Sequence, residues 1–277
     1  MNIFFFGYSS FAAQDLIKRF INNKKTFFFG RKNENLKNFT YFDLNNVEKT
    51  NFKKFKIKKI DYIFFFTSFV PLKEQKSNWH ECKDANIVGL IKLLKNIKIP
   101  IKKIISISSC SVYGSDRVKT YNEDSTLYPE SNYALSKFAQ EQIFRVYCYS
   151  NNIKFLCFRL AYVFGKGINK NRLVKKIIID FKKKKQVRLF NKSLNLNLIH
   201  TKDIDQIIFD NFKKLEGVFN MSYKYKITLG DYFNKVNFDK YIYKKDVNNF
   251  LNKKLLKLYP KFIKTDPNKR IEEFIND

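Results

Sequence analysis

The sequence predicts an α/β protein built on a doubly wound parallel sheet, with a smaller mixed α/β lobe toward the C-terminus. Short, wholly apolar runs such as Ile3–Phe6 and Tyr62–Phe66 lack polar alternation, which is typical of parallel strands buried on both faces. Amphipathic segments of helical length separate these runs. The first run passes directly into a turn of small residues that begins at Gly7. These features predict a sheet whose strands alternate with helices.

The composition limits the classes of partner. The 277 residues are enough for a large core, as one domain or as a main domain with a smaller lobe. A formal net charge of +29 raises nucleic acid or an anionic membrane as a partner. The lysines are spread through the chain together with many Asn, Phe and Ile residues, which indicates a bias of the whole composition. We therefore expect neither nucleic acid nor a membrane as a partner.

The cysteine and histidine residues predict neither a disulfide framework nor a metal site. The four cysteines show no paired spacing, and the two histidines lie far apart: Cys82, Cys110, Cys148, Cys157, His80 and His200. The N-terminus resembles no signal peptide, and no apolar run approaches the roughly 18 to 20 residues of a membrane span. We expect a soluble protein in the cytoplasm.

The first turn fits either an ordinary strand-to-helix connection or a phosphate-binding turn. The stretch Gly7–Ala13 contains one glycine and several small residues, and an amphipathic helix is predicted from there to about Ile21. Small residues let the backbone and the start of a helix approach a pyrophosphate.

The same alternation continues along the chain. It predicts these strands and helices in order: a strand Phe27–Phe29, a strand ending near Asp43, a strand ending before Thr67 and Ser68, a helix Trp79–Lys95, a strand Ile101–Ser108, the helix of Tyr133 and a strand Ile153–Leu160.

A stretch from Ile104 to Glu141 carries the candidate chemistry. Ser109 follows an apolar strand, and Tyr133 and Lys137 are separated by four positions, which brings them onto one face of a helix. A phenol, an ammonium and a hydroxyl aimed at one carbonyl oxygen would serve hydride transfer. The Tyr-x-x-x-Lys spacing also occurs at Tyr162 and Tyr241, so the spacing alone is not specific.

The surroundings of Tyr133 are more specific. Pro129, Ser131, Ser136 and Glu141 accompany Tyr133 and Lys137, all downstream of the sequence SSCSVYG. Here the chain resembles the extended short-chain dehydrogenase/reductase family, the NAD-dependent epimerase/dehydratase enzymes that modify nucleotide sugars. The resemblance covers about residues 2–235 and is strongest up to residue 167.

The resemblance implies a Rossmann fold and a division of the chain. Residues 1–167 would form the dinucleotide-binding domain with the catalytic groups, and residues 168–277 would form mainly a substrate-binding lobe. The segment near residues 197–215 would return to the first domain. The family also implies a homodimer, formed through a four-helix contact that includes the helix Trp79–Lys95 and the helix of Tyr133.

The resemblance implies a role for each catalytic residue. Tyr133 would give the proton to the substrate oxygen, and Lys137 would lower the pKa of that phenol and hold the nicotinamide ribose. Ser109 would hydrogen-bond the substrate carbonyl. The expected substrate contacts are Ser109, Cys110, Ser111 and Tyr133. Family members that dehydrate a sugar carry an acid–base carboxylate pair where this chain has Cys110 and Ser111, which argues against 4,6-dehydration.

The resemblance also implies the cofactor contacts, which are Gly7, Ser9, Ser10, Phe11, Ala12, Arg31, Lys32, Asp43, Leu44, Phe66, Thr67, Ser68, Tyr133 and Lys137. Ser10 and Ala13 replace two glycines of the family's turn. NAD-binding members carry an acidic residue where this chain has Gly30, followed by Arg31. A guanidinium suits a 2′-phosphate, so we expect NADP, with NAD as the alternative.

Three functions stay open at this point. The first is an NADPH-dependent reductase of a 4-keto nucleotide sugar. The second is an NAD-dependent nucleotide-sugar 4-epimerase. The third is a non-catalytic dinucleotide-sensing or RNA-binding protein. One departure concerns the substrate, because Leu196 stands where the family usually has an Arg that clamps the diphosphate.

Overall fold

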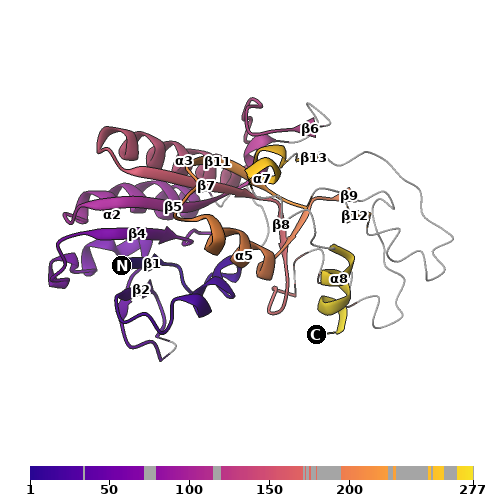
Figure 1. Ribbon diagram of the computed structural model, residues 1–277. Coiled ribbons are helices and arrows are strands. Elements are labelled where there is room, and N and C mark those ends of the chain that lie inside the picture. Colours follow the sequence, from indigo (N-terminus) through magenta and orange to yellow (C-terminus); the bar gives the residue numbers. More distant parts are fainter. Residues whose placement is uncertain are drawn as a thin grey trace.

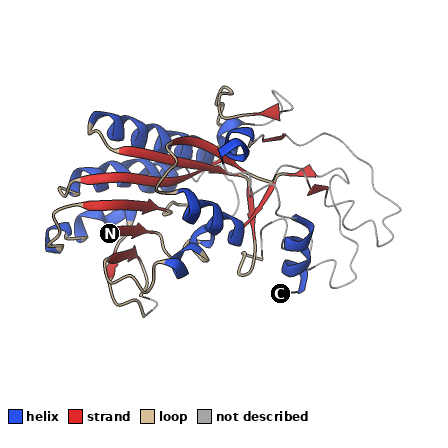
Figure 2. Ribbon diagram, viewed as in Figure 1, coloured by secondary structure: helices blue, strands red, loops and turns tan. Residues whose placement is uncertain are grey.

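A computed structural model describes residues 1–33, 35–71, 79–114, 120–170, 172, 175, 179, 195–223, 227–228, 249–250, 252–258 and 267–276. Seven parallel strands form the central sheet (Figures 1 and 2). They are β1 (Ile3–Phe6), β2 (Thr26–Gly30), β3 (Phe39–Tyr41), β4 (Ile60–Phe65), β5 (Ile101–Ser109), β7 (Lys154–Leu160) and β11 (Gly217–Met221). Their order is β11-β7-β5-β4-β1-β2-β3. The predicted doubly wound fold is therefore confirmed, and the strand order reverses between β1 and β4.

Phenylalanine residues fill both faces of the sheet. Along β1 the side chains alternate, so Phe5 packs on one face and Phe4 and Phe6 on the other. Phe5 stacks on Phe64 of β4 with ring centroids 5.3 Å apart, and Phe6 stacks on Phe29 of β2 at 4.4 Å. The wholly apolar sequence of these strands thus follows from burial on both faces.

Helices α1 (Trp79–Lys83), α2 (Leu90–Asn96) and α3 (Asn132–Ser150) cover one face of the sheet. The helix predicted over Trp79–Lys95 is present, but its middle, η6 (Asp84–Gly89), is a π-helical segment. Gly89 in this segment lies against the 3₁₀ segment η3 (Leu44–Lys49), where an added Cβ would come within 2.2 Å of the Leu44 carbonyl oxygen.

The prediction of an amphipathic helix after Gly7 is wrong in detail. The chain forms two short 3₁₀ segments instead, η1 (Phe11–Ala13) and η2 (Leu16–Arg19). Tertiary bonds hold both segments. The Gln14 amide donates to the Lys166 carbonyl and the Thr201 hydroxyl, and Arg19 pairs with Asp205. Contacts with residues more than 150 positions away thus override the local preference for an α-helix.

Helix α5 (Thr201–Asn211) packs on η1 and η2 and covers the second face of the sheet. It follows β10 (Leu198–His200), which pairs in parallel with β8 (Tyr162–Phe164). The division of the chain into two domains remains a prediction.

Short elements make up the rest of the described chain. They are η4 (Phe52–Lys54), η7 (Cys110–Tyr113), β6 (Thr120–Tyr121), β9 (Asn195–Leu196), β12 (Ile227–Thr228), β13 (Asn249–Phe250), α7 (Lys253–Leu258) and α8 (Pro267–Asn276). Helix α8 docks through Arg270, whose guanidinium lies 2.9 Å from the Asp203 carboxylate at the start of α5.

Cys82, Cys110, Cys148 and Cys157 are free thiols, and all four are buried. Within the described ranges, His, Cys, Asp and Glu side chains nowhere gather in a group of three that could hold a metal. No helix in the described part of the chain has the length and apolarity to span a membrane.

Candidate active site

A cavity of about 1250 Å³ opens at the carboxyl ends of the parallel strands. Its walls come from the residues that follow β1, β2, β4, β5 and β7, where the strand order reverses. In open α/β sheets this edge is the usual ligand site. The volume exceeds the 300 to 1,000 Å³ or so of a common small-molecule pocket, so it has room for a dinucleotide together with a second ligand.

The turn after β1 brings the backbone close to the end of β4. Gly7 has a φ of +76°, and an added Cβ would lie 2.5 Å from the Thr67 backbone nitrogen. Only glycine fits this conformation and this approach. Ser10 and Phe11 follow across the cavity, and the Ala13 amide donates to the Ser10 carbonyl at 2.8 Å. This tight turn fits a dinucleotide phosphate, although the short η1 replaces a full helix behind it.

The cavity end formed by β2 and β3 has no carboxylate at the end of β2. Gly30 lies there because the Tyr8 ring fills the adjoining space, and a Cβ on Gly30 would come 2.7 Å from that ring. Arg31, Asp43 and Leu44 line the same end. Lys32, a predicted cofactor contact, is exposed and lies outside the cavity lining.

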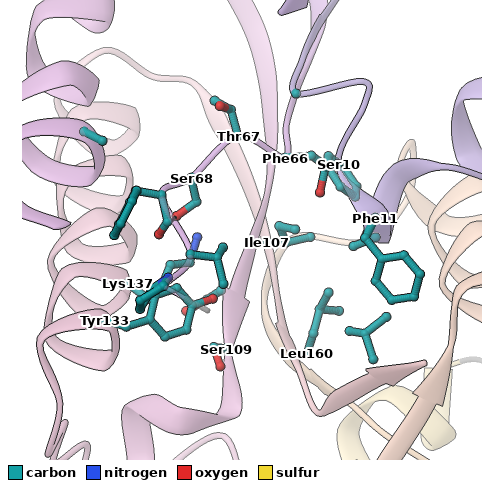
Figure 3. Close-up of a pocket in the computed structure, with 18 of the residues that line it drawn as sticks. Ser10, Phe11, Phe66, Thr67, Ser68, Ile107, Ser109, Tyr133, Lys137 and Leu160 are labelled. Carbon is teal, nitrogen blue, oxygen red and sulfur yellow. Dashed lines mark hydrogen bonds between the residues drawn. The ribbon is translucent and has the colours of Figure 1, made fainter. Parts of the chain in front are cut away.

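At the opposite end, α3 presents Tyr133 and Lys137. The Ser131 hydroxyl caps this helix by accepting a hydrogen bond from the Ala134 amide at 3.1 Å, which fixes Tyr133 in the first turn. Figure 3 shows Tyr133 beside Lys137, with Ser109 near them on the same side of the cavity. Lys137 is 2% exposed, and burial lowers the pKa of its ammonium to about 8.

The Ser109 hydroxyl is oriented by Ser111. Its oxygen accepts hydrogen bonds from the Ser111 amide at 3.1 Å and from the Ser111 hydroxyl at 2.9 Å. A serine hydroxyl has two acceptor positions and one donor proton. Both acceptor positions of Ser109 are therefore used, and its proton can be directed at a ligand oxygen in the cavity.

Cys110 lines the cavity but is buried. Its thiol donates to the Arg159 carbonyl at 3.3 Å, and burial raises its pKa far above the ordinary value. A thiol that stays protonated is neither a base nor a nucleophile.

A buried ion pair supports the strands behind the site. Arg159 at the end of β7 binds the Glu141 carboxylate of α3 with both its Nη2 and Nε atoms, at 2.7 and 3.1 Å. Its Nη1 donates to the Tyr113 hydroxyl at 2.7 Å, and that hydroxyl donates to Asn220 at 2.8 Å. This network joins α3 to β7, to β11 and to the turn after β5 that contains Tyr113.

All the other predicted contacts line the cavity together: Gly7, Ser9, Ser10, Phe11, Ala12, Arg31, Asp43, Leu44, Phe66, Thr67, Ser68, Ser109, Cys110, Ser111, Tyr133 and Lys137. Further lining residues were not predicted, among them Ile168, Asn169, Arg172 and Asn197. These come from the C-terminal half of the chain. The turn Gly165–Gly167 directly before Ile168 is a sequence signal that could have drawn attention to the first three of them.

The fold and the site define a class of protein: a dinucleotide-dependent enzyme with a Ser, Tyr and Lys group beside a large cavity. A family model described as the NAD dependent epimerase/dehydratase family matches residues 3–215. The chain belongs to this family and is an enzyme of the extended short-chain dehydrogenase/reductase type.

Solved structures with the same fold are distant in sequence. A UDP-glucose 4-epimerase from Thermotoga maritima with UDP-glucose has a TM-score of 0.80 and 19% identity, over 100% of this chain and 98% of that one. A dTDP-glucose 4,6-dehydratase from Bacillus anthracis in complex with NAD has a TM-score of 0.75 and 16% identity, over 100% and 96%. A UDP-N-acetylglucosamine 4-epimerase from Methanobrevibacter ruminantium, in complex with UDP-N-acetylmuramic acid, has a TM-score of 0.74 and 19% identity, over 99% of this chain and 97% of that one. Among curated proteins, none matches the sequence.

Proposed function

We propose that this enzyme reduces the 4-keto group of a nucleotide sugar with NADPH. The observation that carries this proposal is the end of β2, where Gly30 removes the carboxylate and Arg31 lines the cavity. A carboxylate there would bind the 2′-hydroxyl of NAD, whereas a guanidinium binds a 2′-phosphate through charge-assisted hydrogen bonds.

The chain's own residues supply the proton and stabilise the developing charge. The Gly7 turn, Arg31 and Lys137 would hold the dinucleotide, which would supply the hydride for the carbonyl carbon. Ser109 donates its free proton in a hydrogen bond to the carbonyl oxygen, and Tyr133 transfers a proton to that oxygen as it becomes an alkoxide. The Lys137 ammonium one turn away stabilises the phenolate that Tyr133 leaves behind.

The substrate side favours a ketone reduction over a dehydration. Cys110 is a buried neutral thiol and Ser111 is committed to Ser109, so these two positions offer no carboxylate acid–base pair. Among the described residues of the C-terminal half, Arg172 is the cation that lines the cavity. We assign it to the substrate diphosphate, because Leu196 cannot carry that charge.

We also propose a homodimer formed by the helices over Trp79–Asn96 and by α3. Large apolar side chains are exposed on these helices: Val88, Ile91, Leu135, Val146 and Tyr149. Tyr149 is 88% exposed. Exposed apolar side chains that cluster on one surface are typical of a protein–protein interface. Light scattering should give twice the chain mass for the native protein and the single chain mass for Tyr149→Glu. A monomeric native protein would refute the dimer.

From the buried free thiols we infer a cytoplasmic location.

An NAD-dependent 4-epimerase is the second candidate, because two of the similar structures described above are 4-epimerases. An epimerase retains its dinucleotide between turnovers, whereas a reductase exchanges it. The purified protein should therefore be denatured, and any released dinucleotide identified by mass and fluorescence. An empty site that binds NADPH far better than NADH, followed by oxidation of NADPH with a 4-keto nucleotide sugar, is the expected result. Stoichiometric NAD would refute the reductase and favour the epimerase.

The non-catalytic hypothesis is tested separately with Tyr133→Phe. This change should abolish turnover and leave dinucleotide binding intact. Tight, salt-sensitive RNA binding by a protein without turnover would favour the alternative function.

A further inference from the structure

A buried amide contacts the catalytic lysine. Gln140 lies one helical turn after Lys137 on α3, and both side chains are 2% exposed. The Lys137 ammonium donates a hydrogen bond to Gln140 Oε1 at 2.5 Å. Among the described residues, this oxygen is the one hydrogen-bond acceptor of that ammonium. A buried polar side chain at this place needs such a partner, because an unpaired amide or ammonium in the core is costly.

The other end of the Gln140 amide is fixed by η6. Gln140 Nε2 donates to the Asn86 backbone carbonyl at 3.3 Å. The Asn86 side chain is held in turn by the Phe69 amide at 2.7 Å and by the Ser136 hydroxyl at 2.9 Å. Since one end of the amide faces a carbonyl and the other faces an ammonium, the hydrogen bonds allow one orientation of the Gln140 amide. A flipped amide would set an NH₂ group against the ammonium.

We propose that Gln140 is a positioning residue, which keeps the Lys137 ammonium charged and directed while leaving two of its three N–H donors for the cofactor and the site. This inference rests on the proposed function only in taking Lys137 as the residue that holds the dinucleotide. A neutral amide satisfies one donor without neutralising the charge that Tyr133 requires. A π-helical segment inside an α-helix is frequent at functional sites, and here it carries the carbonyl that braces Gln140.

The other charged groups around α3 leave this role to Gln140. Besides the Tyr133 phenol one turn earlier on α3, two titratable groups of the described residues act on the Lys137 ammonium, Cys157 on β7 and Glu141 on α3. Glu141 is committed to Arg159, and burial raises the pKa of the Cys157 thiol to about 12, so that thiol is neutral.

The remaining elements that pack on α3 add little charge. On β5 the nearby polar groups are the Ser106 and Ser108 hydroxyls, and in η6 Asp84 is exposed and paired with Lys83. On α1, His80 and Glu81 are exposed, and Cys110 and Tyr113 of η7 have pKa values raised by burial and are neutral.

The test measures how dinucleotide affinity depends on pH, which requires no sugar substrate. The dissociation constant of NADPH or NADH is measured by fluorescence from pH 6 to pH 10, for the wild type and for Gln140→Leu and Gln140→Glu. Gln142→Leu is the matched control, because Gln142 is on the same helix and contacts the exposed Arg145 instead.

We expect the alkaline loss of binding to move to lower pH by about one unit in Gln140→Leu, because the ammonium has lost its acceptor. In Gln140→Glu it should move to higher pH, because a carboxylate favours the charged lysine, and in Gln142→Leu it should not move. A merely structural role would weaken binding equally at every pH, and that result, or shifts of the same sign in both variants, would overturn the inference. If the pH shifts occur as expected but the protein reduces no 4-keto nucleotide sugar, the positioning role of Gln140 is supported and the proposed function is refuted.

Discussion

At the scale of single residues, Ser111 decides what Ser109 can do. The Ser111 hydroxyl and amide occupy both acceptor positions of Ser109, and in the proposed reaction this leaves the Ser109 proton for the substrate oxygen. Ser111 does not have to touch the substrate to affect the rate.

Replacing Ser111 by Ala removes one of these two donors. We expect kcat to fall about threefold to tenfold, the value of one neutral hydrogen bond, with dinucleotide affinity unchanged. Ser111→Thr keeps the hydroxyl and should keep most of the rate. Steady-state kinetics of both variants with a 4-keto nucleotide sugar measures this effect. An unchanged kcat in Ser111→Ala would show that Ser109 needs no such orientation.

The proposed preference for NADP rests on Arg31 at the same scale. Arg31→Ala should weaken NADPH binding roughly 10- to 100-fold, because charge-assisted hydrogen bonds to the 2′-phosphate are lost. NADH binding should hardly change, because NADH lacks that phosphate. Fluorescence titration measures both affinities, and Lys32→Ala is the matched control outside the cavity. Equal losses for both dinucleotides would contradict the assignment.

At the scale of elements, the Arg159–Glu141 pair joins β7 to α3. Both side chains are almost fully buried, and the guanidinium satisfies two carboxylate oxygens and the Tyr113 hydroxyl. Breaking such a pair leaves an uncompensated charge in the core, which costs more than removing both partners.

Arg159→Met should therefore lower the free energy of unfolding by about 3–5 kcal/mol. The double variant Arg159→Met/Glu141→Leu should recover part of this loss, because no charge then stays buried alone. Urea unfolding of the two single variants and the double variant gives the coupling energy. Losses that simply add would show that the two side chains do not stabilise each other.

At the scale of the whole molecule, the buried Lys137 costs stability. Burial lowers the pKa of this ammonium from 10.5 to about 8 in the folded protein. Below pH 8 the folded protein must bury the charge, so the cost is fully present. Between pH 8 and 10.5 the folded protein releases the proton before the unfolded chain does, so stability rises with pH.

Lys137→Met should accordingly stabilise the protein at pH 7 by roughly 2–3 kcal/mol, while abolishing turnover. The gain over the wild type should shrink as the pH rises from 8 to 10.5. Urea unfolding of both proteins at pH 7 and pH 10 measures this difference. A destabilised variant at pH 7 would mean that the hydrogen bond to Gln140 outweighs the desolvation of the ammonium.

The sequence was sufficient for the sheet and for most of the site. Wholly apolar runs such as Ile3–Phe6 form strands wherever both faces are buried, and the observed strand ends lie within a few residues of the predicted ones. Tyr133 and Lys137 are four positions apart on one helix, so their proximity follows from helix geometry alone. These features depend on short-range periodicity, which a single sequence displays.

Only the tertiary structure decided the remaining features, because they depend on contacts between distant positions. Gln14 and Arg19 contact residues beyond position 165, and they hold 3₁₀ turns where local preference favours a helix. Arg172 reaches the cavity wall from the far half of the chain, and Gln140 is braced by a carbonyl of η6. Such contacts have no period along the chain. The sequence by itself therefore determined the succession of strands and helices and the pairing of Tyr133 with Lys137 on one helix, whereas packing decided the cavity's far wall and the surroundings of Lys137.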